Sequence, residues 1–201
     1  MNTHLYTSEV PRSKRKTDDE VLDELLPTIL VAGLDRITLE EMGAAVGLSS
    51  STLLQRFGSR WGVIEAALDR STDALEQTLA EPPPEGADPR EALIDWLADL
   101  ARPVADKRRL VGSLQVLGRD ILVAARNRQA RRHLGLMRQR IESALVDMGF
   151  DPAAATPQAL VVEAHWHGLV VQWALHGDGT LDAWIRHGLM TLLRQLSHDN
   201  P

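Results

Sequence analysis

Apolar residues recur at helical spacing along almost the whole chain. Between Val21 and Leu30 they fall on one side of a helix with a period of about 3.6 residues, and most later segments repeat this pattern. No run shows the two-residue alternation of β-branched residues that is typical of half-buried strands. The pattern therefore predicts an all-α protein, and 201 residues are enough for one large domain or two small domains with a core.

Cap and stop signals divide the chain into successive helices. Two threonine–glutamate pairs have the spacing of capping boxes, which satisfy free N–H groups at a helix start: Thr17 with Glu20, and Thr38 with Glu41. Pro27 lies inside the first pattern and is expected to kink that helix or shift its start. The clearest break is residues 81–89, with three consecutive prolines. The expected helices cover about residues 18–32, 39–46, 50–57, 59–79, 89–102, 105–117, 119–148, 156–175 and 181–196.

Three short helices in the first 60 residues, the last two joined at Gly47, have the order of a helix-turn-helix. In that motif the third helix enters the DNA major groove with its N-terminal residues near the base edges. Hydroxyls at residues 49–52 suit close approach to phosphates and bases, and the basic stretch 11–16 can reach phosphates or the minor groove. A well-capped surface helix that binds no DNA would show the same serines, so both interpretations stay open.

The stretch ITLEEMGAAVGLSSSTLLQRFGSRWGVIEAAL, residues 37–68, resembles the N-terminal domain of the TetR family of transcriptional repressors. The matching positions are the helix-opening Thr38, Met42-Gly43 in place of Ile-Ala, the turn Gly47-Leu48-Ser49, and then Thr52-Leu53, Phe57 and Ser59-Arg60. The resemblance implies a DNA-binding domain with a basic arm over residues 1–60. It also implies a helical effector-binding and dimerisation domain over residues 61–201.

Three positions depart from the family pattern. Leu54 stands where the family commonly has a tyrosine that bonds a phosphate, and a leucine can only contact a thymine methyl or pack. Ser51 replaces a glycine, and Arg60 replaces a phosphate-binding lysine while keeping its charge. Gln55 and Arg56 are the expected base readers, because glutamine suits adenine and arginine suits guanine. The candidate DNA-binding residues are Lys14, Arg15, Lys16, Thr38, Ser49, Ser50, Ser51, Thr52, Leu54, Gln55, Arg56 and Arg60.

Tryptophans fall on the apolar faces of the C-terminal helices. The resemblance implies a ligand cavity among these helices, and aromatic walls with few polar groups suit a small lipophilic or aromatic effector. The candidate effector-binding residues are Trp96, Gln115, Arg119, His133, Met137, Trp166 and Trp173. A packed core without a cavity, in a protein that binds DNA constitutively, would place tryptophans at the same spacing.

The last two helices carry more apolar surface than two terminal helices of a monomer usually need. Gly168 would let a partner helix approach closely. We therefore expect a homodimer with a twofold four-helix interface, which would hold two recognition helices about one DNA turn or a multiple of it apart on a palindromic operator. The candidate interface residues are Gly168, Leu175, Trp184, Leu189, Leu192, Leu193 and Leu196.

Composition and motifs argue against several other classes of protein. The chain has no cysteine, which excludes disulfides and favours a cytoplasmic location. Its apolar runs fall far short of the roughly 20 residues of a membrane helix, and the start lacks the charged-then-apolar order of a signal peptide. No phosphate loop, nucleophile elbow or metal motif occurs, so we expect neither an enzyme nor a cofactor or metal.

The net charge of −6 argues against indiscriminate coating of nucleic acid but allows a local basic footprint. The prediction is a ligand-responsive DNA-binding repressor that acts as a homodimer on double-stranded DNA. One alternative is a helical small-molecule-binding or scaffold protein with a degenerate helix-turn-helix, which Leu54 and the acidic balance favour. Another is a helical metal-dependent enzyme, which rests only on histidines such as His165 and His167.

Overall fold

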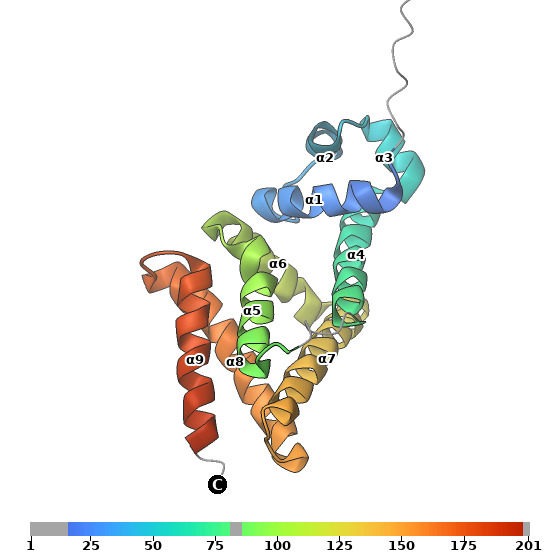
Figure 1. The fold of residues 1–201 in the computed structure, drawn as a ribbon. Coiled ribbons are helices and arrows are strands. Elements are labelled where there is room, and N and C mark those ends of the chain that lie inside the picture. The colour runs from blue at the N-terminus through green and yellow to red at the C-terminus, as the bar shows by residue number, and fades with distance from the viewer. Residues whose placement is uncertain (1–15, 81–85, 199–201) are drawn as a thin grey trace, which may run out of the picture.

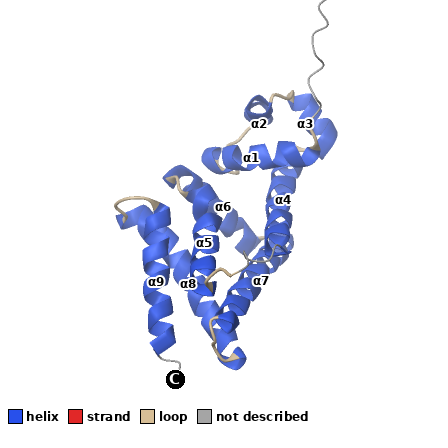
Figure 2. Cartoon of the chain, viewed as in Figure 1, coloured by secondary structure: helices blue, strands red, loops and turns tan. Residues whose placement is uncertain are grey.

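The computed structural model describes residues 16–80 and 86–198, and every regular element in these two segments is a helix (Figures 1 and 2). The predicted all-α fold is therefore confirmed. The elements are α1 (Asp18–Ala32), α2 (Leu39–Val46), α3 (Ser50–Phe57), α4 (Arg60–Ala80), α5 (Pro89–Ala101), a short 3-10 helix η1 (Arg102–Val104), α6 (Lys107–Leu122), α7 (Ala124–Asp147), α8 (Pro152–His176) and α9 (Leu181–His198). None of these helices combines the length and apolar composition of a membrane-spanning segment.

The two capping boxes form as the sequence predicts. The Thr17 hydroxyl accepts a hydrogen bond from the Glu20 N–H at 3.2 Å, and the Glu20 carboxylate accepts one from the Thr17 N–H at 2.8 Å. Thr38 and Glu41 repeat this exchange at the start of α2, again at 3.2 and 2.8 Å. These bonds lower the pKa of both glutamates, because they stabilise the ionised carboxylate.

Two helix boundaries differ from the prediction. α6 continues through Gly118, and the break falls at Val123, whose backbone is extended at φ −103° and ψ 113°. α8 begins at Pro152 and not near residue 156, because Asp151 caps it and a proline in the first turn sacrifices no intrahelical hydrogen bond. Pro157 and Pro27 both lie inside helices, so neither marks a helix start.

The described helices enclose two apolar cores. The first is formed by α1, α2, α3 and the first half of α4, with Leu25, Ile29 and Leu53 fully buried. The second is formed by α5, α7, α8 and α9 together with Leu110 of α6, and Leu97, Ile141 and Ile185 are fully buried in it. Because α4 contributes Val63 and Ile64 to the first core, the N-terminal packing unit extends past residue 60.

α6 connects the two cores by lying directly against α1. A Cβ atom at Gly112 would stand 1.9 Å from the main-chain oxygen of Leu30, so the two helices touch through their backbones. Figure 1 shows α6 leaving this contact and running toward the start of α7. The position of the helix-turn-helix unit therefore depends on α6 as well as on the continuous helix α4.

We expect Gly112→Ala to lower the free energy of unfolding by about 1–3 kcal/mol, because the added methyl group forces α6 away from α1. Gly118→Ala, in the same helix, is the matched control, since an added Cβ there meets nothing within 4 Å. The control should instead raise stability by about 0.5–1 kcal/mol through helix propensity. Urea denaturation of both variants measures the difference, and equal stabilities would contradict the close contact.

Candidate nucleic-acid interface

A tight turn sets the angle between α2 and α3. Gly47 ends α2 in the left-handed conformation, with φ 72° and ψ 31°. A Cβ atom at Gly43 would stand 2.4 Å from the main-chain oxygen of Leu48, so α2 meets the turn backbone to backbone. The fully buried Leu53 then anchors α3 to the first core. These contacts fix which side of α3 faces outward.

The outward side of α3 is formed by three uncharged residues. Ser51, Leu54 and Gln55 are exposed and lie at positions i, i+3 and i+4, so their side chains share one face. Leu54 is 42% exposed although it is large and apolar. Figure 1 shows α2 and α3 beyond α1, at the end of the molecule away from α7, α8 and α9. This face is therefore free to contact a macromolecule.

The hydroxyl groups at the start of α3 form a capping network. Ser49 accepts a hydrogen bond from the Thr52 N–H at 3.1 Å, and its hydroxyl lies 2.8 Å from the hydroxyls of both Ser51 and Thr52. Ser50 and Thr52 are half-buried, whereas Ser51 is exposed. Capping therefore accounts for Ser49, and Ser51 presents its hydroxyl on the outer face of α3.

Two arginines expected to contact DNA bind the protein itself, which corrects that part of the prediction. Arg56 forms an ion pair with Asp18 and donates a hydrogen bond to the main-chain oxygen of Lys16 at 3.2 Å, and its side chain is only 12% exposed. Arg60 donates to the main-chain oxygens of Leu34 and Ile37. Both guanidinium groups therefore hold together the helix-turn-helix unit.

The other predicted polar contacts near the arm are also engaged. Lys16 pairs with Glu24 at 2.5 Å and donates to the main-chain oxygen of Val46 at 3.1 Å. The Thr38 hydroxyl is occupied by the capping box of α2. Lys14 and Arg15 lie outside the described residues.

Residues 16–60 are acidic, with four lysines and arginines against eight aspartates and glutamates. Three of the four cations, Lys16, Arg56 and Arg60, are bound to protein oxygen atoms. Phosphate contacts supply most of the sequence-independent affinity of DNA-binding proteins. Positive charge for such contacts is therefore left to the exposed Arg36 and to Arg12, Lys14 and Arg15 of the arm.

Five of the seven candidate effector residues lie on α5, α7 and α8. Trp166 and Met137 are buried in the second core, and the Trp166 indole donates to the main-chain oxygen of Leu97 at 2.8 Å. Trp173 is also buried and donates to the main-chain oxygen of Gly179 at 3.2 Å. Trp96 is half-buried against the same core, and His133 is half-buried on α7. These side chains belong to one region. The indole N–H groups of Trp166 and Trp173 both donate hydrogen bonds to main-chain oxygens of the protein itself.

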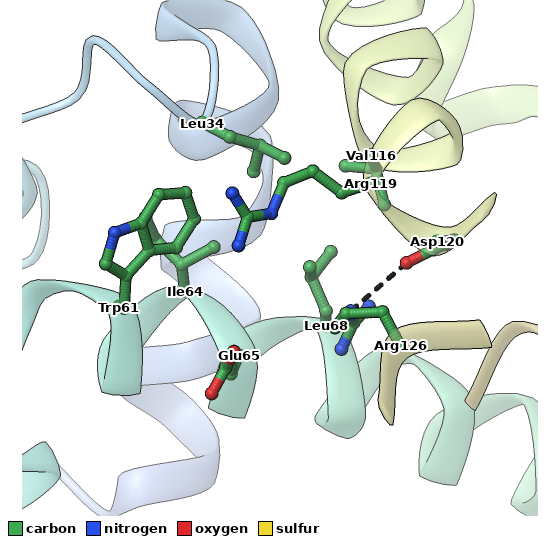
Figure 3. A pocket seen from close by; sticks show the side chains of 9 residues that line it. All are labelled: Leu34, Trp61, Ile64, Glu65, Leu68, Val116, Arg119, Asp120 and Arg126. Atoms are coloured by element: carbon green, nitrogen blue, oxygen red, sulfur yellow. Dashed lines mark hydrogen bonds and ion pairs between the residues drawn. The ribbon is translucent and has the colours of Figure 1, made fainter. Parts of the chain in front are cut away.

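Gln115 and Arg119 lie elsewhere, which corrects their assignment to an effector site. The Gln115 side chain covers Gly33 at the end of α1, where an added Cβ would stand 2.7 Å from its amide oxygen. The Arg119 guanidinium carbon lies 3.9 Å from the centre of the Trp61 ring. Figure 3 shows Arg119 reaching from α6 toward Trp61 on α4, in a narrow crevice between the two units.

Arg126, which the sequence did not single out, joins three helices beside this crevice. Its nearly buried side chain pairs with Asp69 of α4 at 3.2 Å and with Asp120 of α6 at 3.1 Å (Figure 3 shows the second pair). Burial raises the pKa of Asp120, and the charge of Arg126 opposes that rise. Burial lowers the pKa of His133, the nearby His167 lowers it further, and Asp120 opposes the shift. Gly112, Gln115, Arg119 and Arg126 together join α6 and α7 to α1 and α4.

The candidate interface residues divide into two groups. Leu189 and Leu193 are 0% and 1% exposed in the chain's own second core, so they cannot meet a partner and that assignment is corrected. Trp184, Leu192 and Leu196 are half-buried against the same core. Gly168 and Leu175 are exposed on α8, and Leu175 is 69% exposed.

A second exposed feature of α8 was not recognised from the sequence. Apolar or small residues follow one another along an exposed face at alternating spacings of three and four: Val161, Ala164, Gly168, Val171 and Leu175. This spacing is typical of a helix that packs along another helix. We call these five residues the α8 stripe.

No group of three histidine, cysteine, aspartate or glutamate side chains suited to a metal ion occurs in residues 16–80 and 86–198. A scan against protein-family models and a search of curated protein sequences found no match.

Solved structures do match over most of the chain. A TetR transcriptional regulator from Legionella pneumophila superposes with a TM-score of 0.73 at 14% identity, covering 89% of this chain and 98% of that one. A transcriptional regulator from Saccharomonospora viridis in complex with choline gives 0.71 at 20% identity, covering 87% and 93%. One from Rhodococcus sp. Rha1 gives 0.68 at 19% identity, covering 90% and 97%. The chain therefore has the fold of TetR-family transcriptional regulators.

The corrected role of Arg56 leads to a stability prediction. We expect Arg56→Ala to lower the free energy of unfolding by about 1–2 kcal/mol, because it leaves Asp18 and the Lys16 carbonyl without their charged donor. Gln55→Ala is the matched control, since Gln55 is the exposed neighbour and should change stability by less than about 0.5 kcal/mol. Chemical denaturation distinguishes the two variants. An Arg56→Ala protein as stable as the control would show that the Arg56 contacts do not stabilise the fold.

Proposed function

We propose that the protein is a transcriptional regulator that binds double-stranded DNA through α2 and α3. The observation that carries this proposal is the exposed outer face of α3, held outward by the buried Leu53 and the tight turn at Gly47. A short helix with exposed hydroxyl, amide and methyl groups fits the major groove, where base edges present matching groups. The shared fold with TetR-type regulators supports the same conclusion.

In vitro selection with the purified full-length chain tests DNA binding directly. Enrichment of a sequence with two related half-sites is the expected outcome, because a twofold dimer reads an inverted repeat. Failure to enrich any sequence would instead support a helical binding protein with a degenerate helix-turn-helix. The acidic surface of residues 16–60 is the observation that favours this second function.

The basic arm should supply most of the salt dependence of binding. Replacing Lys14 and Arg15 together by alanine should weaken all sequences similarly, because phosphate contacts carry no sequence information. The slope of log affinity against log salt should flatten by about two for each protomer bound, at roughly 0.9 for each lost phosphate contact. Fluorescence anisotropy between low and moderate salt measures this slope. An unchanged slope would show that the arm does not contact DNA.

The proposed dimer forms through the α8 stripe. Its five residues lie on a face of α8 that the chain's own core leaves exposed, and they offer a continuous apolar seam to a second copy. An added Cβ at Gly168 meets nothing within 4 Å, so the middle of the seam has room for a close neighbour. A twofold partner would place Leu175 of one protomer against the stripe of the other.

Leu175→Glu should weaken the dimer by about 100-fold or more, because an unpaired charge in a buried interface costs several kcal/mol. Val146→Glu is the control, since Val146 is 39% exposed on α7 and lies outside the stripe. Sedimentation equilibrium measures both dissociation constants. A wild-type chain that stays monomeric at micromolar concentration would contradict the proposed assembly.

We further propose a small lipophilic or aromatic effector that binds among α5, α7 and α8 and releases DNA. Trp96, Met137 and Trp166 provide apolar side chains there, and His133 of α7 is the titratable residue among the candidate effector-binding residues on these helices. A change at α7 would reach α4 and α6 through Arg126. Effector and DNA would then weaken each other's binding by the same factor.

A further inference from the structure

Leu54 is the central side chain of the outer face of α3, and the structure leaves it without a packing partner in the core. It is 42% exposed, whereas the adjacent Leu53 is completely buried. Consecutive residues on a helix point about 100° apart, so α3 cannot rotate to cover Leu54 without exposing Leu53. With Leu53 buried, Leu54 must stay on the outer face of α3, where it would contact any molecule that binds this face.

The surroundings of Leu54 exclude a phosphate as its target. Its neighbours on the outer face are Ser51 and Gln55, which are uncharged. Arg56, the charged residue of α3, is turned away and paired with Asp18. A leucine has no hydrogen-bond donor or acceptor, so it gains affinity only by covering an apolar group.

The major groove offers one apolar group among the four bases, the C5-methyl of thymine. We propose that Leu54 contacts this methyl group, so that each operator half-site has a thymine at the position facing Leu54. This inference rests on the proposed DNA-binding function and adds the base that α3 selects there. The polar edges of the other three bases would lose water against Leu54 without gaining a hydrogen bond.

Substitution of deoxyuridine for thymidine tests the contact, because it removes only the C5-methyl. In the operator obtained by selection, each thymidine is replaced in turn, symmetrically in both half-sites, and affinity for the full chain is measured by anisotropy. One symmetric pair of positions should lose affinity by about 15-fold, or about fourfold for each half-site, as expected for one buried methyl group. Leu54→Ala should bind the thymidine and deoxyuridine duplexes equally.

Gln55→Ala is the control variant on the same face. It should bind more weakly than the wild type but keep the discrimination between thymidine and deoxyuridine, since its side chain is not the one that meets the methyl group. Circular dichroism checks that both variants are folded, which their exposed positions favour.

The outcomes separate this inference from the proposed function. A protein that enriches no DNA sequence overturns both. Operator binding that no deoxyuridine substitution weakens, or discrimination that survives in Leu54→Ala, overturns the thymine contact and leaves the regulator intact. The thymine contact is supported if Leu54→Ala no longer distinguishes thymidine from deoxyuridine while Gln55→Ala still does.

Discussion

The backbone contact between Gly112 of α6 and Leu30 of α1 determines where the helix-turn-helix unit can lie. An oxygen atom of α1 occupies the space that a side chain at Gly112 would need, so the two helices meet backbone to backbone. Around this point, Arg119 stacks on Trp61 and Arg126 bridges Asp69 and Asp120. Polar side-chain contacts thus surround this close backbone contact, and a movement of α6 would break several of them together.

Local signals predicted the helix-turn-helix well. The capping boxes of α1 and α2, the left-handed Gly47 and the inward Leu53 all depend on residues within four positions of one another, which a sequence shows directly. The start of α8 was predicted wrongly because either Pro152 or Pro157 could begin a helix. The aspartate cap beside Pro152 decides between them. The break between α6 and α7 has no proline or glycine at Val123, so no local signal marked it.

Side-chain assignments failed where distant partners decide them. Arg56 meets Asp18, 38 positions earlier, and Arg126 meets Asp69, 57 positions earlier, so the sequence alone could not show either pair. Leu189 and Leu193 were assigned to a partner although the chain's own core buries them. α8 is apolar on more than one face, and periodicity does not say which face stays exposed. The alternating spacing of the α8 stripe was the available signal.

The acidic character of residues 16–60 bears on how the proposed DNA binding would work. A basic surface binds any duplex through phosphates, and specificity is then a small addition to a large common affinity. In the proposed complex, residues 16–60 would repel phosphates on average, while Arg12, Lys14 and Arg15 would attract them. Contacts of Ser51, Leu54 and Gln55 with bases would then decide whether the complex forms at all. Such a division would give a high ratio of specific to non-specific affinity, because a wrong sequence would leave the arm as the main attraction.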